Sequence, residues 1–370
     1  MIKVAIIFGT RPEAIKVAPV IEELKKFPNN FDVFTIASGQ HKEMLDQALM
    51  PFNIKPDFNL NIMTANQTLT QITTRILVKI EEVLEKITPD LVLVQGDTPT
   101  AFVASLASFY QKIPLGHIEA GLRTFNKYEP FPEEINRKLI DHLADLYFAP
   151  TEINRDNLYK EGIKKKVYVT GNTVVDALLK IASQKNSFRD PVFEKIDFEK
   201  KVILLEVHRR ESWGKSLENV FRAIRAVGKK FKDVQIVFPV HPNPLVKYPA
   251  QKILGKSKNV FLTPPMDYSD LVAIMKRCYL VVTDSGGLQE EAPTFGKPVL
   301  VVRNVTERME GLRAGTLKLI GLDEKNVFEE ISRLLKNRRE YAKMARADNP
   351  YGDGKASQRI RKIIENYFFK

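Results

Sequence analysis

The chain has 370 residues, 44% of them hydrophobic and 28% charged, and carries a net charge of +12. This length exceeds one ordinary hydrophobic core and favours two domains, while the composition is typical of a globular protein and excludes a disordered or membrane-spanning chain. Acidic residues are interleaved with the lysines, and no helix-turn-helix, zinc-finger or RNA-binding motif accompanies the charge. The sequence therefore predicts no nucleic-acid partner.

The start of the chain and its cysteine content indicate the compartment. Residues 2–8 run directly into a glycine turn, without a separate apolar targeting region or a small-residue cleavage site. The only cysteine, Cys278, cannot form a disulfide within the chain and is expected to be a buried thiol. We expect a cytoplasmic protein with no membrane partner.

Apolar segments rich in Val, Ile and Leu alternate with helical patterns along both halves of the chain. An alternation of this kind predicts parallel, doubly wound sheets, and its restart near residue 202 predicts two similar α/β domains. The clearest helix carries Leu69, Ile76, Ile80 and Leu84 on one face. The expected strands are residues 4–8, 33–37, 91–95, 115–118, 146–149 and 167–170 in the first half, and 202–207, 235–240, 260–262, 280–283, 299–302 and 317–320 in the second.

The residues that follow the expected strands of the first half are unusually polar. Ligands bind outside the carboxyl ends of parallel strands, so these residues are candidates for a site. Arg11 and Lys16 follow the first strand and can meet phosphate, while Asp97 and Glu119 each follow a later strand and can act as acid or base. Asp97 as a helix cap and Glu119 as an ion-pair partner of Arg123 remain the alternatives. Glu133 begins a helix, where a carboxylate is common in any protein.

The second half has its own polar strand ends. Residues 279–302 contain two buried strand patterns joined through Ser285, Gly286 and Gly287, which let the backbone turn sharply beside a diphosphate. In the following helix, Glu290 and Glu291 are placed to accept bonds from ribose hydroxyls. His208 follows another strand together with Arg209, where both can bind an anion and His208 can protonate a leaving phosphate. No His, Cys or carboxylate spacing predicts a metal site.

A series of short motifs follows the same order as in a known family. The motifs are Gly9-Thr10-Arg11-Pro12-Glu13-Ala14, Gln40-His41, Gly96-Asp97-Thr98, His117-Ile118-Glu119-Ala120-Gly121-Leu122-Arg123, Pro132-Glu133-Glu134, Thr170-Gly171-Asn172-Thr173, His208-Arg209-Arg210-Glu211, Ser285-Gly286-Gly287, Gln289-Glu290-Glu291-Ala292-Pro293 and Asn349-Pro350-Tyr351-Gly352-Asp353-Gly354. Over essentially its whole length the chain resembles the non-hydrolysing UDP-N-acetylglucosamine 2-epimerases.

The resemblance implies a GT-B-like α/β fold, with two Rossmann-like domains facing a central cleft. It gives residues 1–170 as the domain with the catalytic carboxylates, 171–352 as the UDP-binding domain, and 353–370 as a final helix that packs back on the first domain. It also implies a homodimer, UDP-N-acetylglucosamine and UDP as ligands, and neither a metal nor a nicotinamide cofactor.

The family's functional residues can be carried onto matching positions. The resemblance assigns the chemistry to Asp97, Glu119, Glu133 and His208, and it assigns UDP binding to Arg11, Lys16, His208, Ser285, Gly286, Gly287 and Glu291. Gln40, Arg209 and His241 match a pocket in which some bacterial relatives bind a second UDP-N-acetylglucosamine as activator.

The sequence also departs from the family pattern. Glu206 and Val207 precede His208 where many relatives have small residues, and Asn66 stands where some activated relatives have an arginine, which leaves activation by substrate open.

The implied reaction explains why several carboxylates and cations are needed. The proton at C2 of the sugar is not acidic, so its removal requires expulsion of UDP from C1, which gives 2-acetamidoglucal and then UDP-N-acetylmannosamine after re-addition. Cations stabilise the departing diphosphate, and more than one acid or base is needed to reach both faces of C2. The alternative function is a glycosyltransferase of the same fold, which uses the same diphosphate contacts but leaves C2 untouched.

Overall fold

The computed structural model describes residues 1–39, 45, 48–64, 67–184 and 191–369. The chain divides into two compact units, one of Met1–Leu179 with Tyr351–Lys370 and the other of Lys180–Pro350. The sequence predicts boundaries after residues 170 and 352 instead. The first boundary differs because α7 (Thr173–Ser183) begins in the first unit and ends in the second.

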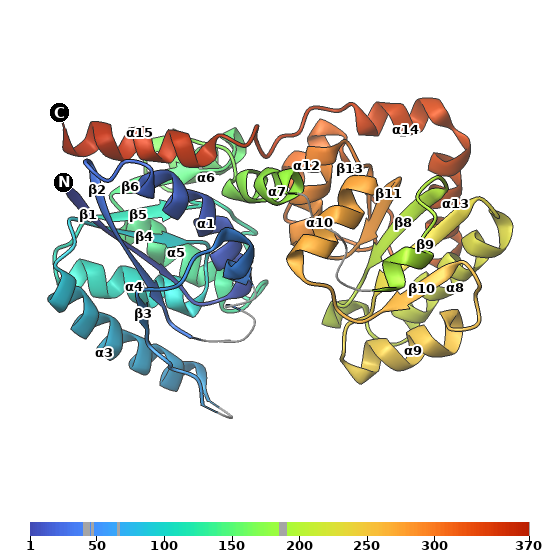
Figure 1. The fold of residues 1–370 in the computed structure, drawn as a ribbon, viewed down its shortest axis with the longest axis horizontal. Coiled ribbons are helices and arrows are strands. Elements are labelled where there is room, and N and C mark those ends of the chain that lie inside the picture. The colour runs from blue at the N-terminus through green and yellow to red at the C-terminus, as the bar shows by residue number, and fades with distance from the viewer. Residues whose placement is uncertain (40–44, 46–47, 65–66, 185–190, 370) are drawn as a thin grey trace. The chain divides into compact units, whose positions relative to one another are not determined.

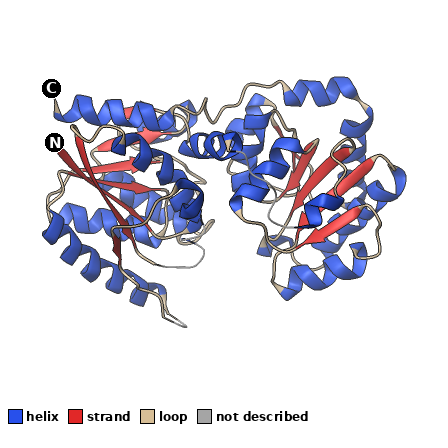
Figure 2. Cartoon of the chain, in the orientation of Figure 1, coloured by secondary structure: helices blue, strands red, loops and turns tan. Residues whose placement is uncertain are grey.

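The first unit is built on a parallel sheet (Figures 1 and 2). Its seven described strands are β1 (Ile2–Phe8), β2 (Phe31–Ala37), β3 (Phe58–Asn59), β4 (Leu91–Gln95), β5 (Leu115–Ile118), β6 (Leu146–Ala149) and β7 (Val167–Val169). The spatial order is β3-β2-β1-β4-β5-β6-β7, so the winding direction reverses between β1 and β4. In doubly wound sheets a ligand site lies at the carboxyl edge near such a reversal.

Helices cover both faces of this sheet. Figure 1 shows α3 and α4 on one side and α1 and α15 on the other, and the contacts between α3 and α4 and between α1 and α15 agree. The described helices are α1 (Arg11–Lys25), α3 (Leu69–Ile87), α4 (Pro99–Tyr110), α5 (Glu133–Leu143), α6 (Glu152–Lys160), α7 and α15 (Ala356–Phe368). On α3 the predicted apolar face is buried at Ile76, Ile80 and Leu84, but Leu69, at the helix start, is exposed.

The last helix, α15, belongs to the first unit although it follows the second in sequence. Arg361 Nε lies 3.0 Å from Glu23 Oε1 of α1. At its other end, the Asp176 carboxylate of α7 accepts hydrogen bonds from the backbone amides of Ala356 and Ser357 at 3.2 and 2.9 Å. These contacts hold α15 against α1 and α7.

The second unit repeats the same architecture. Its parallel strands lie in the order β10-β9-β8-β11-β12-β13, with the reversal between β8 and β11. The strands are β8 (Lys201–Glu206), β9 (Val234–Pro239), β10 (Val260–Thr263), β11 (Leu280–Thr283), β12 (Val299–Val301) and β13 (Leu317–Leu319). The described helices are α8 (Lys215–Lys230), α9 (Pro244–Leu254), α10 (Tyr268–Arg277), α11 (Gly286–Glu291), α12 (Met309–Ala314), α13 (Glu324–Lys336) and α14 (Arg338–Ala345).

The predicted α/β class with two doubly wound sheets is confirmed. The strand segments were predictable because most are buried on both faces and read as continuous apolar runs, as Ile203 and Leu205 illustrate in β8. The exception is β3, which the sequence does not predict because it has only two residues and no apolar run. Within the described part of the chain, every helix is too short or too polar to cross a bilayer.

Candidate active site

The turn after β1 is held by a buried carboxylate. Glu13 Oε2 accepts hydrogen bonds from the amides of Gly9 and Thr10 at 3.0 and 2.7 Å, and Glu13 Oε1 accepts from Thr98 Oγ1 at 2.6 Å. Burial raises the pKa of Glu13 despite these bonds. A Cβ at Gly9 would lie 2.3 Å from the hydroxyl of Thr100, so only glycine fits. The turn therefore fixes the start of α1, where Arg11 and Lys16 lie.

Two predicted site residues meet at the carboxyl edge of this sheet. Lys16 Nζ of α1 lies 2.7 and 2.8 Å from the two carboxylate oxygens of Glu119, which follows β5. The amide of Gln95, the last residue of β4, donates to Glu119 Oε2. Glu119 also has a φ of +73°, a strained backbone conformation for a side chain of its kind. Strain of this type is concentrated at functional sites.

A second carboxylate near this edge is held by α5. Arg137 Nη2 forms an ion pair with Asp97, and Asn136 Nδ2 donates to the Asp97 carbonyl at 2.9 Å. Glu133, the first residue of α5, lies one helical turn before Arg137 and is partly exposed. Its neighbour Glu134 is buried instead and accepts from the amides of Thr124 and Phe125, both at 3.0 Å. The α5 helix thus orients Asp97 through two side chains.

A hydrogen-bond network of buried side chains holds the strand ends that carry Asp97 and Glu119. His117 Nδ1 lies 2.6 Å from Asp141 Oδ1, and His117 Nε2 lies 2.8 Å from the carbonyl oxygen of Gly96, the residue before Asp97. Arg123 Nη2 lies 2.7 Å from Asp141 Oδ2. Burial alone would raise the pKa of Asp141, but His117 and Arg123 outweigh it and the pKa is lowered. Asp141 is therefore a charged anchor for the strand ends that carry the site.

In the second unit the carboxylate of Asp284 organises the histidine loop. It accepts hydrogen bonds from the backbone amides of His208 at 3.0 Å and of Arg209 at 2.9 Å. Arg209 Nε in turn donates to the Asp284 carbonyl at 3.1 Å. Burial raises the pKa of Asp284 to about 6. Asp284 joins the end of β11 to the loop after β8, across the reversal in strand order.

The side chain of His208 contacts Glu206, at the end of β8, and His241, which follows β9. Its Nδ1 lies 2.8 Å from Glu206 Oε1, and its ring stacks on that of His241 with centroids 5.4 Å apart. The ligand atoms of Glu206, His208 and Asp284 lie within 4.8 Å of one another. Their hydrogen bonds to each other and to the backbone explain this closeness, so we interpret the group as a hydrogen-bond cluster and not as a metal centre.

The first residue of α11, Gly286, lies next to the side chains of Arg308 and Glu307. A Cβ at Gly286 would lie 3.4 Å from both Arg308 Nη2 and Glu307 Oε1, so glycine leaves room there. Glu307 Oε2 lies 2.9 Å from Arg303 Nη1, and its Oε1 lies 3.4 Å from Arg308 Nη1. Burial would raise the pKa of Glu307, but Arg308, Arg303 and Arg209 outweigh it and lower the pKa to about 2.

The two glutamates of α11 have different surroundings. Glu290 Oε1 lies 2.7 Å from Arg308 Nε, which engages it inside the protein. Glu291 Oε1 accepts a hydrogen bond from the hydroxyl of Tyr268 at 3.2 Å, and this contact orients the carboxylate at the end of α11. The two carboxylates thus have different partners, and the predicted contact of Glu291 with a ribose stays a prediction.

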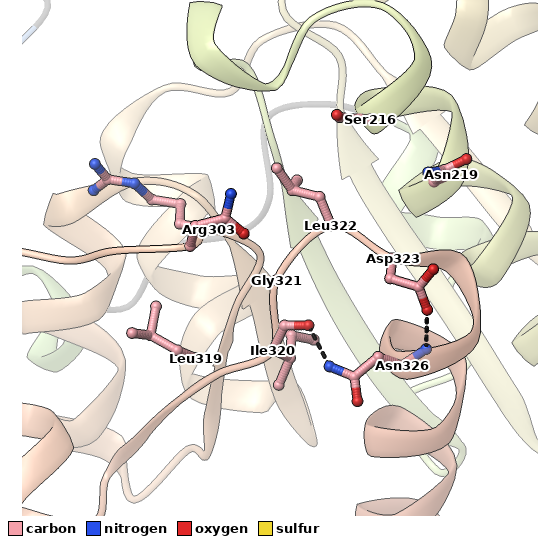
Figure 3. Close-up of a pocket in the computed structure, with 10 residues that line it drawn as sticks. Ser216, Asn219, Arg303, Leu319, Ile320, Gly321, Leu322, Asp323 and Asn326 are labelled. Atoms are coloured by element: carbon pink, nitrogen blue, oxygen red, sulfur yellow. Dashed lines mark hydrogen bonds between the residues drawn. The ribbon is translucent and has the colours of Figure 1, made fainter.

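A cavity of about 550 Å³ lies at the ends of β12 and β13 (Figure 3). None of its lining residues is among the predicted site residues. Two of its polar residues bond within the protein: Asp323 caps α13 by accepting from the Asn326 amide at 2.9 Å, and Asn326 Nδ2 donates to the Ile320 carbonyl at 2.6 Å. We therefore place the candidate site at the strand ends described above.

Comparison with known proteins decides the family. The family model described as UDP-N-acetylglucosamine 2-epimerase matches residues 22–365. The UDP-N-acetylglucosamine 2-epimerase of Bacillus subtilis (strain 168) is 52% identical over 369 residues, which cover 100% of this chain and 95% of the relative.

The chain belongs to the UDP-N-acetylglucosamine 2-epimerase family. A crystal structure of a putative family member from Listeria monocytogenes matches with a TM-score of 0.92 and 47% identity, covering 100% of this chain and 97% of that chain. The structure of the Neisseria meningitidis enzyme bound to UDP-GlcNAc matches with a TM-score of 0.90 and 47% identity, covering 98% and 100%. These similarities establish the predicted GT-B-like fold.

The structure contradicts two alternatives from the sequence analysis, namely Asp97 as a helix cap and Glu119 as the ion-pair partner of Arg123. Thr98, and not Asp97, caps α4, since its hydroxyl accepts from the Ala101 amide at 3.1 Å. Arg123 forms ion pairs with Asp141 and Glu161, whereas Glu119 forms its ion pair with Lys16. The roles of Asp97 and Glu119 in the reaction stay predictions.

Cys278, Asp284 and Ser285 lie close to the two ends of β11. The side chain of Ser285 makes no capping bond to α11, and Asp284 binds the histidine loop instead of that helix. Cys278 lies between α10 and β11 and is buried, as predicted, and burial raises the pKa of its thiol to about 12.

The predicted activator residues are only partly described. His241 stacks on His208, and Arg209 is tied to Asp284 in the same loop cluster. Gln40 and Asn66 lie outside the described residues. An activator pocket therefore stays a prediction.

Sequence reasoning missed several residues that shape the site. Gln95 and Arg137 contact the predicted carboxylates, while Arg308 and Tyr268 contact or flank α11. Arg308 directly precedes α12 and does not directly follow β12, so the strand-end rule does not single it out. Arg137 lies one helical turn after Glu133, a spacing that marks it as a neighbour.

Proposed function

We propose that the protein interconverts UDP-N-acetylglucosamine and UDP-N-acetylmannosamine. The observation that carries this proposal is the match to curated epimerases at about 50% identity over the whole chain. The Neisseria meningitidis relative, whose structure is bound to UDP-GlcNAc, supports the substrate. The positions of Lys16, Glu119 and Asp97 at one sheet edge support the residue roles.

The reaction begins with elimination across C1 and C2. A carboxylate takes the C2 proton, the C2–H electron pair forms the ring double bond, and the C1–O bond breaks with its pair going to UDP. We assign the stabilisation of the departing diphosphate to Arg11, Lys16 and His208, together with the backbone at Ser285, Gly286 and Gly287. Glu291 is proposed to bind the ribose.

The second half returns UDP to C1 and a proton to the opposite face of C2. Two faces require acids or bases on both sides of the sugar, and Asp97, Glu119 and Glu133 are the candidates. Lys16 contacts both oxygens of Glu119, so we assign it the role of orienting this carboxylate as well as binding the diphosphate. His208 is assigned the proton donated to the leaving phosphate.

The first prediction follows the C2 hydrogen in heavy water. The protein incubated with UDP-N-acetylglucosamine, without a sugar acceptor, is expected to form UDP-N-acetylmannosamine with deuterium at C2. Glu119→Gln or Asp97→Asn should slow this at least about 100-fold if the residue is an acid or base. Glu152→Gln, at an exposed carboxylate on α6, is the matched control. Protium at C2 with no manno isomer would favour a glycosyltransferase instead.

We also propose that the enzyme is a homodimer that acts in the cytoplasm, as the family resemblance implies. Light scattering on the purified chain measures its mass against the 42.2 kDa expected of a monomer. A monomeric mass at working concentration would contradict the proposed dimer. Recovery of the activity outside the cytoplasmic fraction would contradict the proposed location.

A further inference from the structure

A carboxylate next to the predicted diphosphate site contacts His208. Glu206, the last residue of β8, places Oε1 2.8 Å from His208 Nδ1. The other oxygen, Oε2, accepts a hydrogen bond from Thr283 Oγ1 at 3.0 Å. Thr283 Oγ1 also accepts from the amide of Ser285 at 2.9 Å. Glu206 is thus held between β8 and β11 and cannot reorient without losing its partly buried hydrogen bond to Thr283.

The neighbouring His241 differs from His208 in the partner of its Nδ1 atom, which is a hydrogen-bond donor and not a carboxylate. His241 Nδ1 accepts a hydrogen bond from the backbone amide of Asn243 at 3.1 Å, which requires a lone pair on that nitrogen. Burial and the nearby His208 lower the pKa of His241. A neutral His241 ring stacked at 10° on His208 offers its π face to a cation.

The charged groups around His208 include two carboxylates and one cation. Asp284 Oδ1 lies 3.7 Å from His208 Nδ1, and Arg209 is the next residue in the loop. The hydrogen bond to Glu206 is the largest influence, and it raises the pKa of His208 against burial and Arg209. Because Asp284 already accepts two backbone amides, Glu206 is the carboxylate with the short contact to the ring.

We propose that Glu206 is a positioning residue that holds His208 as an imidazolium and directs its Nε2–H away from Glu206, toward an anionic ligand. A histidine bonded through Nδ1–H to a carboxylate has its ring orientation and tautomer fixed. As a cation it can donate both a hydrogen bond and a proton through Nε2. The stack on neutral His241 favours the same charged state.

The consequence for the reaction rests on the proposed function. His208 would meet the diphosphate already protonated, and it would stay protonated to a higher pH than an isolated histidine. A raised histidine pKa means that charge-dependent UDP binding is complete at low pH and is lost as pH rises through that pKa. Removing the Glu206 charge moves this loss to lower pH.

The test compares histidine titrations in the full-length protein without ligand. The five histidines are labelled with ¹⁵N, and His208→Gln identifies the His208 signal. An opposite charge at this distance shifts a pKa by about 1 to 3 units, so Glu206→Gln should lower the His208 pKa by at least about one unit. Glu206→Asp should give an intermediate value. Glu199→Gln, at an exposed carboxylate before the other end of β8, should leave it unchanged.

UDP calorimetry across pH gives the second measurement. At pH above both pKa values, a fall of one unit reduces the imidazolium fraction tenfold, so Glu206→Gln should weaken UDP binding by up to about tenfold there and not at low pH. The same His208 pKa in wild type and Glu206→Gln would overturn the inference. If Glu206→Gln does not fold, Glu206→Asp decides it in the same way. Absence of UDP binding to the wild type would contradict the proposed function, while the ligand-free titration would still decide the role of Glu206.

Discussion

Among single residues, Glu291 has a contact that predicts its effect on ligand binding. Tyr268 holds the Glu291 carboxylate at 3.2 Å, so the substitution Glu291→Gln removes a charge without removing the side chain's support. Hydrogen bonds to a charged acceptor contribute about 1.5 to 3 kcal/mol, so UDP binding should weaken by that amount while the fold stays intact. Calorimetry measures it, with the half-exposed Glu329→Gln on α13 as control. An affinity equal to that of the wild type would remove Glu291 from the site.

Asp141 is the residue for which we predict a loss of stability. Its partners His117 and Arg123 have fully buried side chains, and removing one member of a buried ionic network leaves the others unpaired. Asp141→Asn should lower the free energy of unfolding at pH 7 by about 3 to 5 kcal/mol. Denaturant titration measures this, and Asp156→Asn at an exposed pair on α6 should change little.

The pH dependence of Asp141 follows from its lowered pKa. A carboxylate whose pKa is lower in the folded state stabilises the protein above its unfolded pKa of about 3.9, and this stabilisation is lost as pH falls from there through the folded pKa. The difference in unfolding free energy between wild type and Asp141→Asn should therefore shrink as the solution is acidified below about pH 4. A difference that stays constant would show that the charge of Asp141 contributes nothing.

At the scale of helices, α15 depends on a carboxylate from another helix. Asp176 of α7 accepts from the amides of Ala356 and Ser357 and from the Ser357 hydroxyl at 2.6 Å, so it satisfies amides that the first turn of a helix cannot pair. Asp176→Ala should destabilise the protein by about 2 kcal/mol and speed hydrogen exchange in α15.

A nearby ion pair provides the control for this helix. Asp353 and Arg359 lie 2.7 Å apart, but both side chains are about half exposed, and pairs of this type contribute about 0 to 1 kcal/mol. Asp353→Asn should therefore leave exchange in α15 nearly unchanged. If both variants exchange α15 amides at the wild-type rate, Asp176 is not the cap that holds this helix.

At the scale of the whole molecule, we predict that UDP changes the small-angle scattering of the protein, because the predicted ligand residues are divided between the two units. Arg11 and Lys16 belong to the first unit, while Ser285 and Glu291 belong to the second. A ligand bound by both favours whichever arrangement lets both sets touch it. Small-angle scattering should show a smaller radius of gyration with saturating UDP than without it. The variant Glu291→Gln at the same UDP concentration should show less change, and an unchanged wild-type profile would contradict the prediction.

The sequence by itself determined the architecture and indicated where a ligand site is expected. Strands such as β4 and β11 are buried on both faces, so their residues are uniformly apolar and their limits can be read from the sequence. The residues after a strand are not needed for the core, so polar side chains there indicate a ligand site. For this reason the amino-acid sequence alone predicts Lys16, Asp97 and Glu119 as site residues.

Only the tertiary structure decided how these side chains are paired. Lys16 and Glu119 are 103 residues apart in sequence, and Glu206 meets Thr283 from a strand 77 residues away. The sequence offered Arg123, four residues from Glu119, as the candidate ion-pair partner of Glu119. The physical reason is that hydrophobic pattern fixes which residues form a strand, whereas the order of strands in the sheet fixes which strand ends are neighbours. Hydrogen bonds and ion pairs act over a few ångströms, so they depend on that spatial order and not on sequence separation.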